Sequence, residues 1–318
     1  MGGKVTCTLG EVKNRADFLI FWGGNPADCH PLHFSRYSLL PKGRYVPEGR
    51  KGRTMVLVDV RETPSVRFSD IFLQVRPGKD FEVITTLRAL VKNQPVNKAL
   101  VEETGLSLEQ LQDLVDRMKN CRFGVIFFGM GLSMTRGKHM NSAGVLALAA
   151  ELNAYTKFVS MPMRGHGNVA GADVVMRYLT GFPFGVNLSR GYPRFNPGEF
   201  STVDLLVRGD NDATLVLGAD PGATMPQPAI DHLTRTPTIV LDPKVTHTSL
   251  LSRVHFTTAT TGISAPGTAY RMDEIPIPLK PILESPYPTD EEVIRRIHEK
   301  ILGKPAWNPS AYEEVPCA

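Results

Sequence analysis

The sequence contains few cysteines, and no two of them form a close pair. Cys7, Cys29, Cys121 and Cys317 are the four cysteines of the chain, and the spacing Cys-x-x-Cys does not occur. Iron–sulfur and zinc sites usually take at least two ligands from such a spacing. We therefore expect that this chain alone builds no metal cluster.

Long apolar runs and runs of basic residues are also missing. No stretch approaches the roughly 18 apolar residues of a membrane span, and the N-terminus lacks the apolar core of a signal peptide. The formal net charge of +4 is small for 318 residues, so a nucleic-acid-binding protein is not indicated. We expect a cytoplasmic protein with no membrane span and no nucleic-acid partner.

Short apolar runs alternate with segments of helical periodicity. The expected strands are 18–22, 54–58, 123–128, 158–161, 214–217 and 238–241, all rich in β-branched or aromatic residues. The expected helices are 81–91, 108–118, 142–153 and 291–301, where apolar residues return every three or four positions. This alternation predicts an α/β fold with open, doubly wound, mostly parallel sheets.

One pattern follows two pairs of these strands. Strand 18–22 runs into Gly24-Asn25-Pro26, and strand 54–58 ends in Asp59-Val60-Arg61-Glu62-Thr63. Strand 214–217 runs into Gly218-Ala219-Asp220-Pro221, and strand 238–241 ends in Asp242-Pro243-Lys244-Val245-Thr246. Both copies read strand, Gly-x-(Asn/Asp)-Pro, connection, strand, Asp-x-(Arg/Lys)-x-Thr.

The repeated pattern lies where open α/β sheets bind ligands, beyond the carboxyl ends of their strands. There Asp59 and Asp242 are suited to accept hydrogen bonds from ribose hydroxyls or a guanine edge, and Arg61 or Lys244 to meet phosphate. The alternative is that Gly-x-Asx-Pro only turns the chain and that Asp and Thr cap the next helix. Two copies in matching order favour two related nucleotide half-sites.

Longer motifs resemble the B subunit of formylmethanofuran dehydrogenase over about residues 7–301. They are Cys7-Thr8-Leu9-Gly10-Glu11-Val12-Lys13-Asn14-Arg15-Ala16-Asp17, Trp22-Gly23-Gly24-Asn25-Pro26, His30-Pro31-x-His33-x-Ser35-Arg36, Phe127-Phe128-Gly129-Met130-Gly131, Arg136-Gly137-Lys138-His139, Pro162-Met163-Arg164-Gly165-His166-x-Asn168-Val169, Asn196-Pro197-Gly198-Glu199 and Gly267-Thr268-Ala269-Tyr270-Arg271-Met272. This family lies within the wider group of bis-pterin formate dehydrogenases and dimethyl-sulfoxide-reductase-like enzymes. The resemblance implies two related Rossmann-like domains, as in the centre of those enzymes.

On this basis we expect four segments. Residues 1–120 form the first nucleotide-binding domain, and 121–260 form the second, which carries the Arg-Gly-His loop. Residues 261–302 return to the first domain and end in a helix, and 303–318 form a loose tail.

The resemblance implies that carbon dioxide is reduced to formate for the formylation of methanofuran in methanogenesis. Arg164 is the implied catalytic residue, because a guanidinium binds a carboxylate or bent carbon dioxide through two parallel hydrogen bonds. His166 is implied as a proton relay or a support. From spacing alone, the Arg-Gly-His turn reads as a basic surface loop.

The implied cofactor is bis-molybdopterin guanine dinucleotide with tungsten or molybdenum. The residues that match its binding sites are Gly24, Asn25, Asp59, Arg61 and Thr63 in one half-site, Asp220, Pro221 and Asp242 in the other, and Gly129, Gly131, Arg136 and His139 in the loop after 123–128. Backbone amides of that loop are suited to meet pyrophosphate or pterin, although Gly-Met-Gly alone is equally typical of a plain strand-to-helix turn.

Family members begin with a cysteine-rich segment for a four-iron cluster, followed by a Cys-His or selenocysteine-His pair that ligates the metal. This sequence starts after both, so we expect no metal ligand in it, and we expect an oxidoreductase subunit that is incomplete alone. Either a selenocysteine UGA codon was read as a stop, or the gene is naturally split. Cys29-His30 is not expected to replace the pair, since it lies in a loop that faces a nucleotide.

The implied partners are the amidohydrolase-like A subunit, the C subunit, the β-barrel D subunit and ferredoxin-like iron–sulfur subunits. Two other functions stay open: a metal-free scaffold protein, related to the B subunit, in a formyltransferase/hydrolase complex of one-carbon metabolism, and a non-catalytic protein that uses one nucleotide half-site. The residues Arg164, Asp59, Arg61, Asp220 and Asp242 favour the oxidoreductase, because a scaffold needs no charges that face a cofactor. The missing N-terminal segment favours the scaffold.

Overall fold

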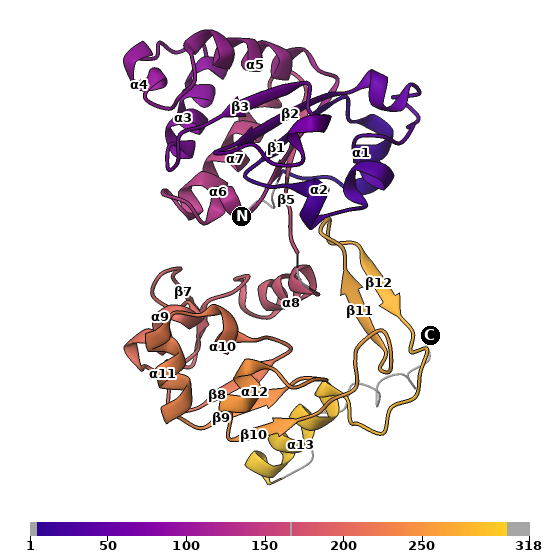
Figure 1. Ribbon diagram of the computed structural model, residues 1–318, viewed down its shortest axis with the longest axis vertical. Helices are drawn as coiled ribbons and strands as arrows, with labels where there is room; N and C mark the ends of the chain where they lie inside the picture. The colour runs from indigo at the N-terminus through magenta and orange to yellow at the C-terminus, as the bar shows by residue number, and fades with distance from the viewer. Residues whose placement is uncertain (1–4, 166, 304–318) are drawn as a thin grey trace. The chain divides into compact units, whose positions relative to one another are not determined.

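The computed structural model describes residues 5–165 and 167–303. Within them the chain forms two compact units (Figure 1). Unit 1 comprises the described residues up to Ala170 together with Tyr270–Ile275. Unit 2 comprises Gly171–Ala269 and the described residues from Pro276 onward.

Unit 1 is built on a five-stranded parallel sheet in the order β3-β2-β1-β4-β5. Its strands are β1 (Phe18–Trp22), β2 (Thr54–Asp59), β3 (Ile71–Gln74), β4 (Phe123–Phe128) and β5 (Lys157–Pro162). The central strand β1 places Ile20 opposite Val56 on one side and Ile126 on the other. The order of strands reverses between β1 and β4, and such a switch point opens a ligand crevice in doubly wound sheets.

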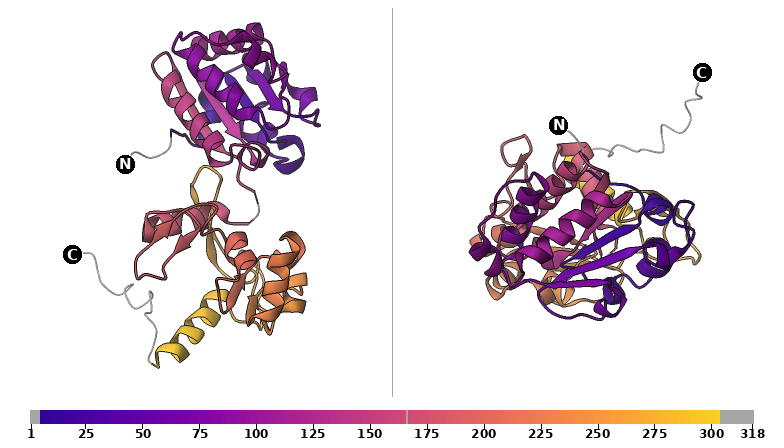
Figure 2. Two further views of the ribbon diagram at one scale, coloured as in Figure 1. Left: turned by 90° about the vertical axis from the view of Figure 1, so that its left-hand side faces the viewer. Right: turned by 90° about the horizontal axis from the view of Figure 1, so that it is seen from above.

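Both faces of this sheet are covered, which is why its central strands are apolar throughout. Along β1, Phe18, Ile20 and Trp22 belong to the core under α3 (Asp80–Val91), α5 (Leu108–Asn120) and α7 (His139–Leu152), whereas Leu19 and Phe21 belong to the core under α1 (Leu9–Arg15). Figure 2 shows the strands of unit 1 between these helices. The helices of unit 1 are α1 (Leu9–Arg15), α2 (Pro26–Cys29), α3 (Asp80–Val91), α4 (Lys98–Glu102), α5 (Leu108–Asn120), α6 (Met130–Ser133) and α7 (His139–Leu152).

Unit 2 contains a smaller parallel sheet in the order β10-β9-β8 and two short two-stranded sheets. Its strands are β6 (Val186–Asn187), β7 (Arg194–Phe195), β8 (Thr214–Leu217), β9 (Thr238–Leu241), β10 (Val254–Phe256), β11 (Gly267–Tyr270) and β12 (Pro276–Leu279). Its helices are α9 (Thr202–Arg208), α10 (Pro221–Thr224), α11 (Gln227–Arg235), α12 (His247–Leu251) and α13 (Asp290–Leu302), and α8 (Val169–Thr180) begins at the end of unit 1.

The predicted fold class is confirmed, because parallel sheets alternate with helices in both units. All six strands and all four helices expected from the sequence are present, and β1, β4, β8 and β9 have the expected bounds. Capping boxes begin two of the expected helices, at Ser107 with Gln110 for α5 and at Thr289 with Glu292 for α13. No helix in the described part of the chain is both long and apolar enough to cross a membrane.

The units divide the chain at other positions than the sequence indicated. The expected boundary at residue 120 falls inside unit 1, because β4 is the parallel neighbour of β1 and β5 pairs with β4. The sequence predicted that residues 261–302 return to the first domain, but only the segment Tyr270–Ile275 belongs to unit 1. Within unit 1 this segment is fixed by hydrogen bonds from the Leu9 amide to Asp273 (2.7 Å) and from the Tyr270 amide to Asn168 (2.7 Å).

A buried arginine joins α1 to the loop before β2. The guanidinium of Arg53, a residue that is 4% exposed, donates to four backbone carbonyls. These belong to Lys13 (2.7 Å), Ala16 (3.0 Å), Leu39 (3.2 Å) and Pro41 (2.5 Å). Burial lowers the pKa of Arg53, and Asp17 partly opposes that shift. The four carbonyls compensate the cost of desolvating the cation.

We expect Arg53→Met to lower the free energy of unfolding of unit 1 by about 3 kcal/mol, because it leaves four carbonyls without their charged donor. Urea unfolding followed by Trp22 fluorescence in a Trp307→Phe background measures this, since the chain has two tryptophans. Arg117→Met is the control, as the Arg117–Asp113 pair lies on the surface of α5 and is expected to contribute less than about 0.5 kcal/mol. Equal losses in the two variants would contradict the prediction.

Candidate functional site

The ends of β1 and β4 meet through direct backbone contact at the switch point. The Gly129 amide donates to the Trp22 carbonyl (2.9 Å), and the Gly131 amide donates to the Gly23 carbonyl (2.9 Å). Gly23 has a positive φ of 58°, and a side chain at Gly129 would overlap the backbone of Gly23 and Gly24. Only glycines allow this approach, so the two strand-end loops meet at one edge of the sheet.

The first Gly-x-Asx-Pro turn is held by the loop that follows β2. Ser65 donates its hydroxyl to Oδ1 of Asn25 (2.6 Å) and accepts the amide of Ala27 (3.1 Å). Asn25 also donates to Asp28 (2.5 Å), and the buried Pro26 opens α2. The side chain of Asn25 therefore shapes the turn, which leaves its backbone and the glycines to face a ligand.

The second turn repeats this arrangement in unit 2. Thr248 donates its hydroxyl to Oδ1 of Asp220 (2.6 Å) and accepts the amide of Gly222 (2.9 Å), and the buried Pro221 opens α10. Ser65 follows Asp59 by six positions, and Thr248 follows Asp242 by six. The two copies thus share one hydrogen-bond geometry. The alternative interpretation, in which the Thr of the pattern caps the next helix, also holds in unit 2, since Thr246 caps α12.

The acidic strand ends differ in burial. Asp59 at the end of β2 is half-buried and its carboxylate accepts the Val60 amide (2.8 Å). Asp242 after β9 is 6% exposed and its carboxylate accepts the Lys244 amide (3.0 Å). Arg61 and Lys244 are exposed. Each site therefore places an acceptor and a cation at a strand end, as the sequence predicted from spacing.

A further acidic residue, which the sequence pattern did not reveal, lies beside the first turn. Asp80 is 3% exposed at the start of α3, and the indole of Trp22 donates to its Oδ1 (2.8 Å). Its Oδ2 is buried and has no hydrogen-bond partner among the described residues, and the same holds for the Thr63 hydroxyl. Burial raises the pKa of Asp80, the Trp22 bond opposes this, and nearby Asp59 raises it further.

The loop after β4 carries Arg136 and His139, both exposed, at the start of α7. Its backbone is strained, since Lys138 has a φ of 45°. Asn141 ties the loop by donating to the carbonyls of Leu132 and Arg136 (both 2.9 Å). This strain at a helix N-terminus is compatible with the predicted phosphate-binding role, which stays a prediction.

Arg164 lies just after β5, next to the other strand ends of unit 1. The Met163 amide donates to the Phe128 carbonyl (2.8 Å), and the Arg164 amide donates to the Pro162 carbonyl (3.1 Å). His30, at the end of α2, is hydrogen-bonded to the Arg164 carbonyl (2.9 Å). Arg164 is half-buried, and His166 lies outside the described residues. The predicted residues therefore fall at strand ends: Gly24, Asn25, Asp59, Arg61, Thr63, Gly129, Gly131, Arg136, His139 and Arg164 in unit 1, and Asp220, Pro221 and Asp242 in unit 2.

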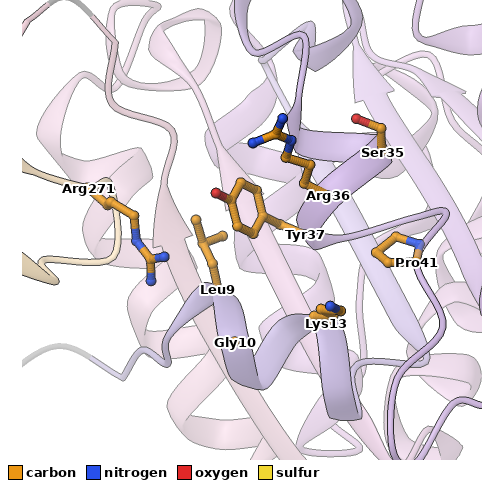
Figure 3. Close-up of a pocket in the computed structure, with 8 residues that line it drawn as sticks. All are labelled: Leu9, Gly10, Lys13, Ser35, Arg36, Tyr37, Pro41 and Arg271. Atoms are coloured by element: carbon orange, nitrogen blue, oxygen red, sulfur yellow. The ribbon is translucent and has the colours of Figure 1, made fainter. Parts of the chain in front are cut away.

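An open pocket of about 470 Å³ lies within unit 1 beside α1 (Figure 3). Its lining is Leu9, Gly10, Lys13, Ser35, Arg36, Tyr37, Pro41 and Arg271. Arg271 is paired with Asp273 (2.6 Å), whereas Lys13 and Arg36 have no carboxylate partner among the described residues. Cationic side chains and hydroxyls make this pocket suited to an anionic group.

The described residues contain no group of three or more His, Cys, Asp or Glu side chains placed to hold a metal ion. Burial raises the pKa of Cys7 to about 12, with smaller contributions from Glu11 and Asp273. Burial likewise raises the pKa of Cys121 to about 12. Without a bound metal, both thiols therefore stay protonated at neutral pH.

No protein-family model matches the chain. It is 45% identical over 301 residues to the B subunit of tungsten-containing formylmethanofuran dehydrogenase 2 from Methanocaldococcus jannaschii, and 43% identical over 301 residues to its counterpart from Methanococcus maripaludis. Both matches cover 94% of this chain and 69% of the relative.

Two solved structures share the fold. The formyltransferase/hydrolase complex from Methylorubrum extorquens with methylofuran has a chain with a TM-score of 0.72 at 19% identity, covering 95% of this chain and 79% of that one. Acetylene hydratase from Pelobacter acetylenicus has a TM-score of 0.64 at 12% identity, covering 93% and 49%. At these identities the likeness concerns the fold alone.

The second turn leads to a prediction of pH-dependent stability. Burial alone would raise the pKa of Asp220, but hydrogen bonds from Thr248 and His247 lower it overall. A carboxylate with a depressed folded-state pKa stabilises the fold above its unfolded pKa and loses this effect as the pH falls through the folded pKa. We therefore expect Thr248→Val to lower the free energy of unfolding by about 1 kcal/mol at neutral pH. The loss should shrink as the pH falls below the ordinary carboxyl value of 3.8.

Urea unfolding at several pH values measures this effect. Thr234→Val is the control, because the Thr234 hydroxyl donates to the backbone carbonyl of Asp231 (2.8 Å) and has no hydrogen bond to a carboxylate among the described residues. A loss in Thr248→Val that does not change with pH would contradict the link to Asp220.

Proposed function

The chain belongs to the family of formylmethanofuran dehydrogenase B subunits, and from this premise we propose that its two Gly-x-Asx-Pro turns each hold one arm of a bis-molybdopterin guanine dinucleotide. Family membership makes the chain an oxidoreductase subunit of a multisubunit enzyme that reduces carbon dioxide to formate for the formylation of methanofuran. The tungsten in the relatives' name implies a molybdopterin-type cofactor. The observation that carries the proposal is the hydrogen-bond geometry shared by the turns at Asn25 and Asp220.

The residues of unit 1 fit one nucleotide arm. A guanine edge presents N–H donors, and the buried Oδ2 of Asp80 with the nearby carboxylate of Asp59 supplies acceptors for them. The buried Thr63 hydroxyl also lacks a partner among the described residues. Arg61 and Arg136 are exposed cations that can meet phosphate. These unsatisfied groups are the kind that a bound polar ligand would pair.

In unit 2, the second arm would meet Asp242 and the turn at Asp220 and Pro221. Asp220 is occupied by Thr248 and His247, so the ligand there would contact the backbone of the turn. Lys244 is the exposed cation of this half-site. The same division of roles holds in both units: the Asx residue shapes the turn, and the acidic strand end receives the nucleotide.

When bound, the metallopterin supplies the two-electron chemistry at its tungsten or molybdenum ion. The role of this chain's own residues is to orient the substrate. Arg164 follows β5 at the same edge of the sheet as the glycine contact, and its planar guanidinium can donate two parallel hydrogen bonds to a carboxylate. Such a fixed cation favours the bent, charged form of the reacting carbon over linear carbon dioxide.

We propose that the protein ligand of the metal lies outside the described residues of this chain. The described residues contain no group of three or more His, Cys, Asp or Glu side chains placed to hold a metal ion. A preceding segment or another polypeptide would supply the ligand and the four-iron cluster. The proposed partners are the amidohydrolase-like A subunit, the C subunit, the β-barrel D subunit and ferredoxin-like iron–sulfur subunits.

Metal and nucleotide analysis of the native complex tests the proposal. We expect two GMP released by acid hydrolysis for each tungsten or molybdenum, because each half-site holds one guanine arm. A single GMP per metal would contradict the two-arm arrangement. A complex with neither metal nor GMP would contradict the proposal and support the scaffold function.

Arg164→Ala is expected to reduce turnover of formate or carbon dioxide by at least about 100-fold, because it removes the donors that orient the carboxylate. Metal and GMP content should stay at the wild-type level. Arg122→Ala is the control, since Arg122 precedes β4 at the opposite edge of the sheet and pairs with Asp17. Full turnover in Arg164→Ala would remove Arg164 from the mechanism.

A further inference from the structure

The hydrogen bond between His30 and Arg164 joins two loops that lie far apart in sequence. Nε2 of His30 lies 2.9 Å from the backbone carbonyl of Arg164, across 134 positions of the chain. His30 follows the last residue of α2, whose first residue, Pro26, belongs to the first Gly-x-Asx-Pro turn. Both His30 and Arg164 are half-buried. The bond therefore connects the loop of the candidate catalytic arginine to the turn of the first half-site.

The tautomer of His30 follows from its two partners. A carbonyl can only accept, so Nε2 must carry the proton that is donated to Arg164. Nδ1 then presents a lone pair in the neutral ring, and Sγ of Cys29 lies 3.0 Å away. Burial raises the pKa of the Cys29 thiol, although backbone hydrogen bonds oppose this, so the thiol keeps its proton and can donate it to Nδ1. The Cys29 thiol thus gives the His30 ring a second hydrogen-bond partner.

Two glycines that follow Arg164, Gly165 and Gly167, have open space where a side chain would lie. Ideal side chains at Gly165 and Gly167 would meet nothing within 4 Å, and Gly167 has a positive φ of 57°. Two glycines in open space leave many backbone conformations accessible. The hydrogen bond from His30 to the Arg164 carbonyl, just before these glycines, restricts the backbone conformation of Arg164. It thereby restricts the positions that the guanidinium can reach.

We propose that His30 is a positioning residue that holds the Arg164 loop against the first half-site, and that Cys29 orients its ring for this bond. The inference rests on the proposed function of Arg164. A guanidinium that binds the substrate through two parallel hydrogen bonds tolerates little displacement, since a shift of about 1 Å can cost about 100-fold in rate. His30 fixes the carbonyl of that same residue relative to the turn at Asn25.

The test compares three variants of the intact complex. His30→Leu removes the donor, and His30→Gln keeps an N–H near the position of Nε2. His232→Leu is the matched control, because His232 is half-buried and its Nε2 bonds the Asn211 carbonyl (3.0 Å) away from any strand-end turn. We expect His30→Leu to lower kcat/KM for formate by about 10- to 100-fold, His30→Gln to stay within about threefold of wild type, and His232→Leu to leave it unchanged.

A second readout does not depend on activity. Hydrogen–deuterium exchange of the amides of residues 163–165 should become faster by about tenfold or more in His30→Leu and not in His30→Gln or His232→Leu. Cys29→Ala should show part of the same acceleration, whereas Cys29→Ser keeps a hydroxyl donor and should not. These exchange rates report on the loop even in a complex without cofactor.

The outcomes are separable from those of the proposed function. Wild-type exchange and wild-type turnover in a metal-loaded His30→Leu complex would overturn the positioning role. Equal losses in His30→Leu and His30→Gln would overturn it too, since the hydrogen bond would then not matter. A wild-type complex without metal and GMP would refute the proposed function alone, while faster exchange in His30→Leu would still support the contact with Arg164.

Discussion

The backbone contact between Gly23 and the glycines at 129 and 131 is the constraint on which the rest of the unit 1 site depends. Parallel pairing of β1 with β4 brings the two loops to one edge, and only the absence of side chains lets them touch. Once they touch, the residues after the neighbouring strands, such as Asp59, Asp80 and Arg164, surround the same edge of the sheet. The contact between these loops thus depends on the strand order and on glycine.

The same hydroxyl contact stabilises the Gly-x-Asx-Pro turn in both units. In unit 1, the Ser65 hydroxyl donates to Asn25 and accepts the amide of Ala27. In unit 2, the Thr248 hydroxyl donates to Asp220 and accepts the amide of Gly222. The units differ in what surrounds the turn. Unit 1 adds the buried carboxylate of Asp80, while in unit 2 the Thr258 hydroxyl after β10 is buried without a partner among the described residues. Related half-sites with different linings suit a cofactor whose two arms are chemically alike but meet different surroundings.

Much of the fold could be predicted from local patterns, and the contacts of the site could not. Fully buried strands such as β1 and β4 were recognised because every residue in them is apolar or small. The strand β3 is not predictable from the sequence pattern because only Leu73 in it is buried, and the turn that leads to Asp80 is therefore not predictable either. The domain boundary differed because pairing of β4 with β1 depends on sheet order, which no local pattern encodes. Bonds between Asn25 and Ser65 or His30 and Arg164 join distant positions, so they appear only in three dimensions.

The central claim is that each turn, at Asn25 in unit 1 and at Asp220 in unit 2, binds one guanine nucleotide arm of the cofactor. A cryo-electron-microscopy map of the native complex tests it most directly. We predict density for one guanine nucleotide beside Asp59 and Asp80 in unit 1 and for another beside Asp242 in unit 2. Density in which both arms contact the same unit, or in which either turn faces no cofactor, would contradict the account.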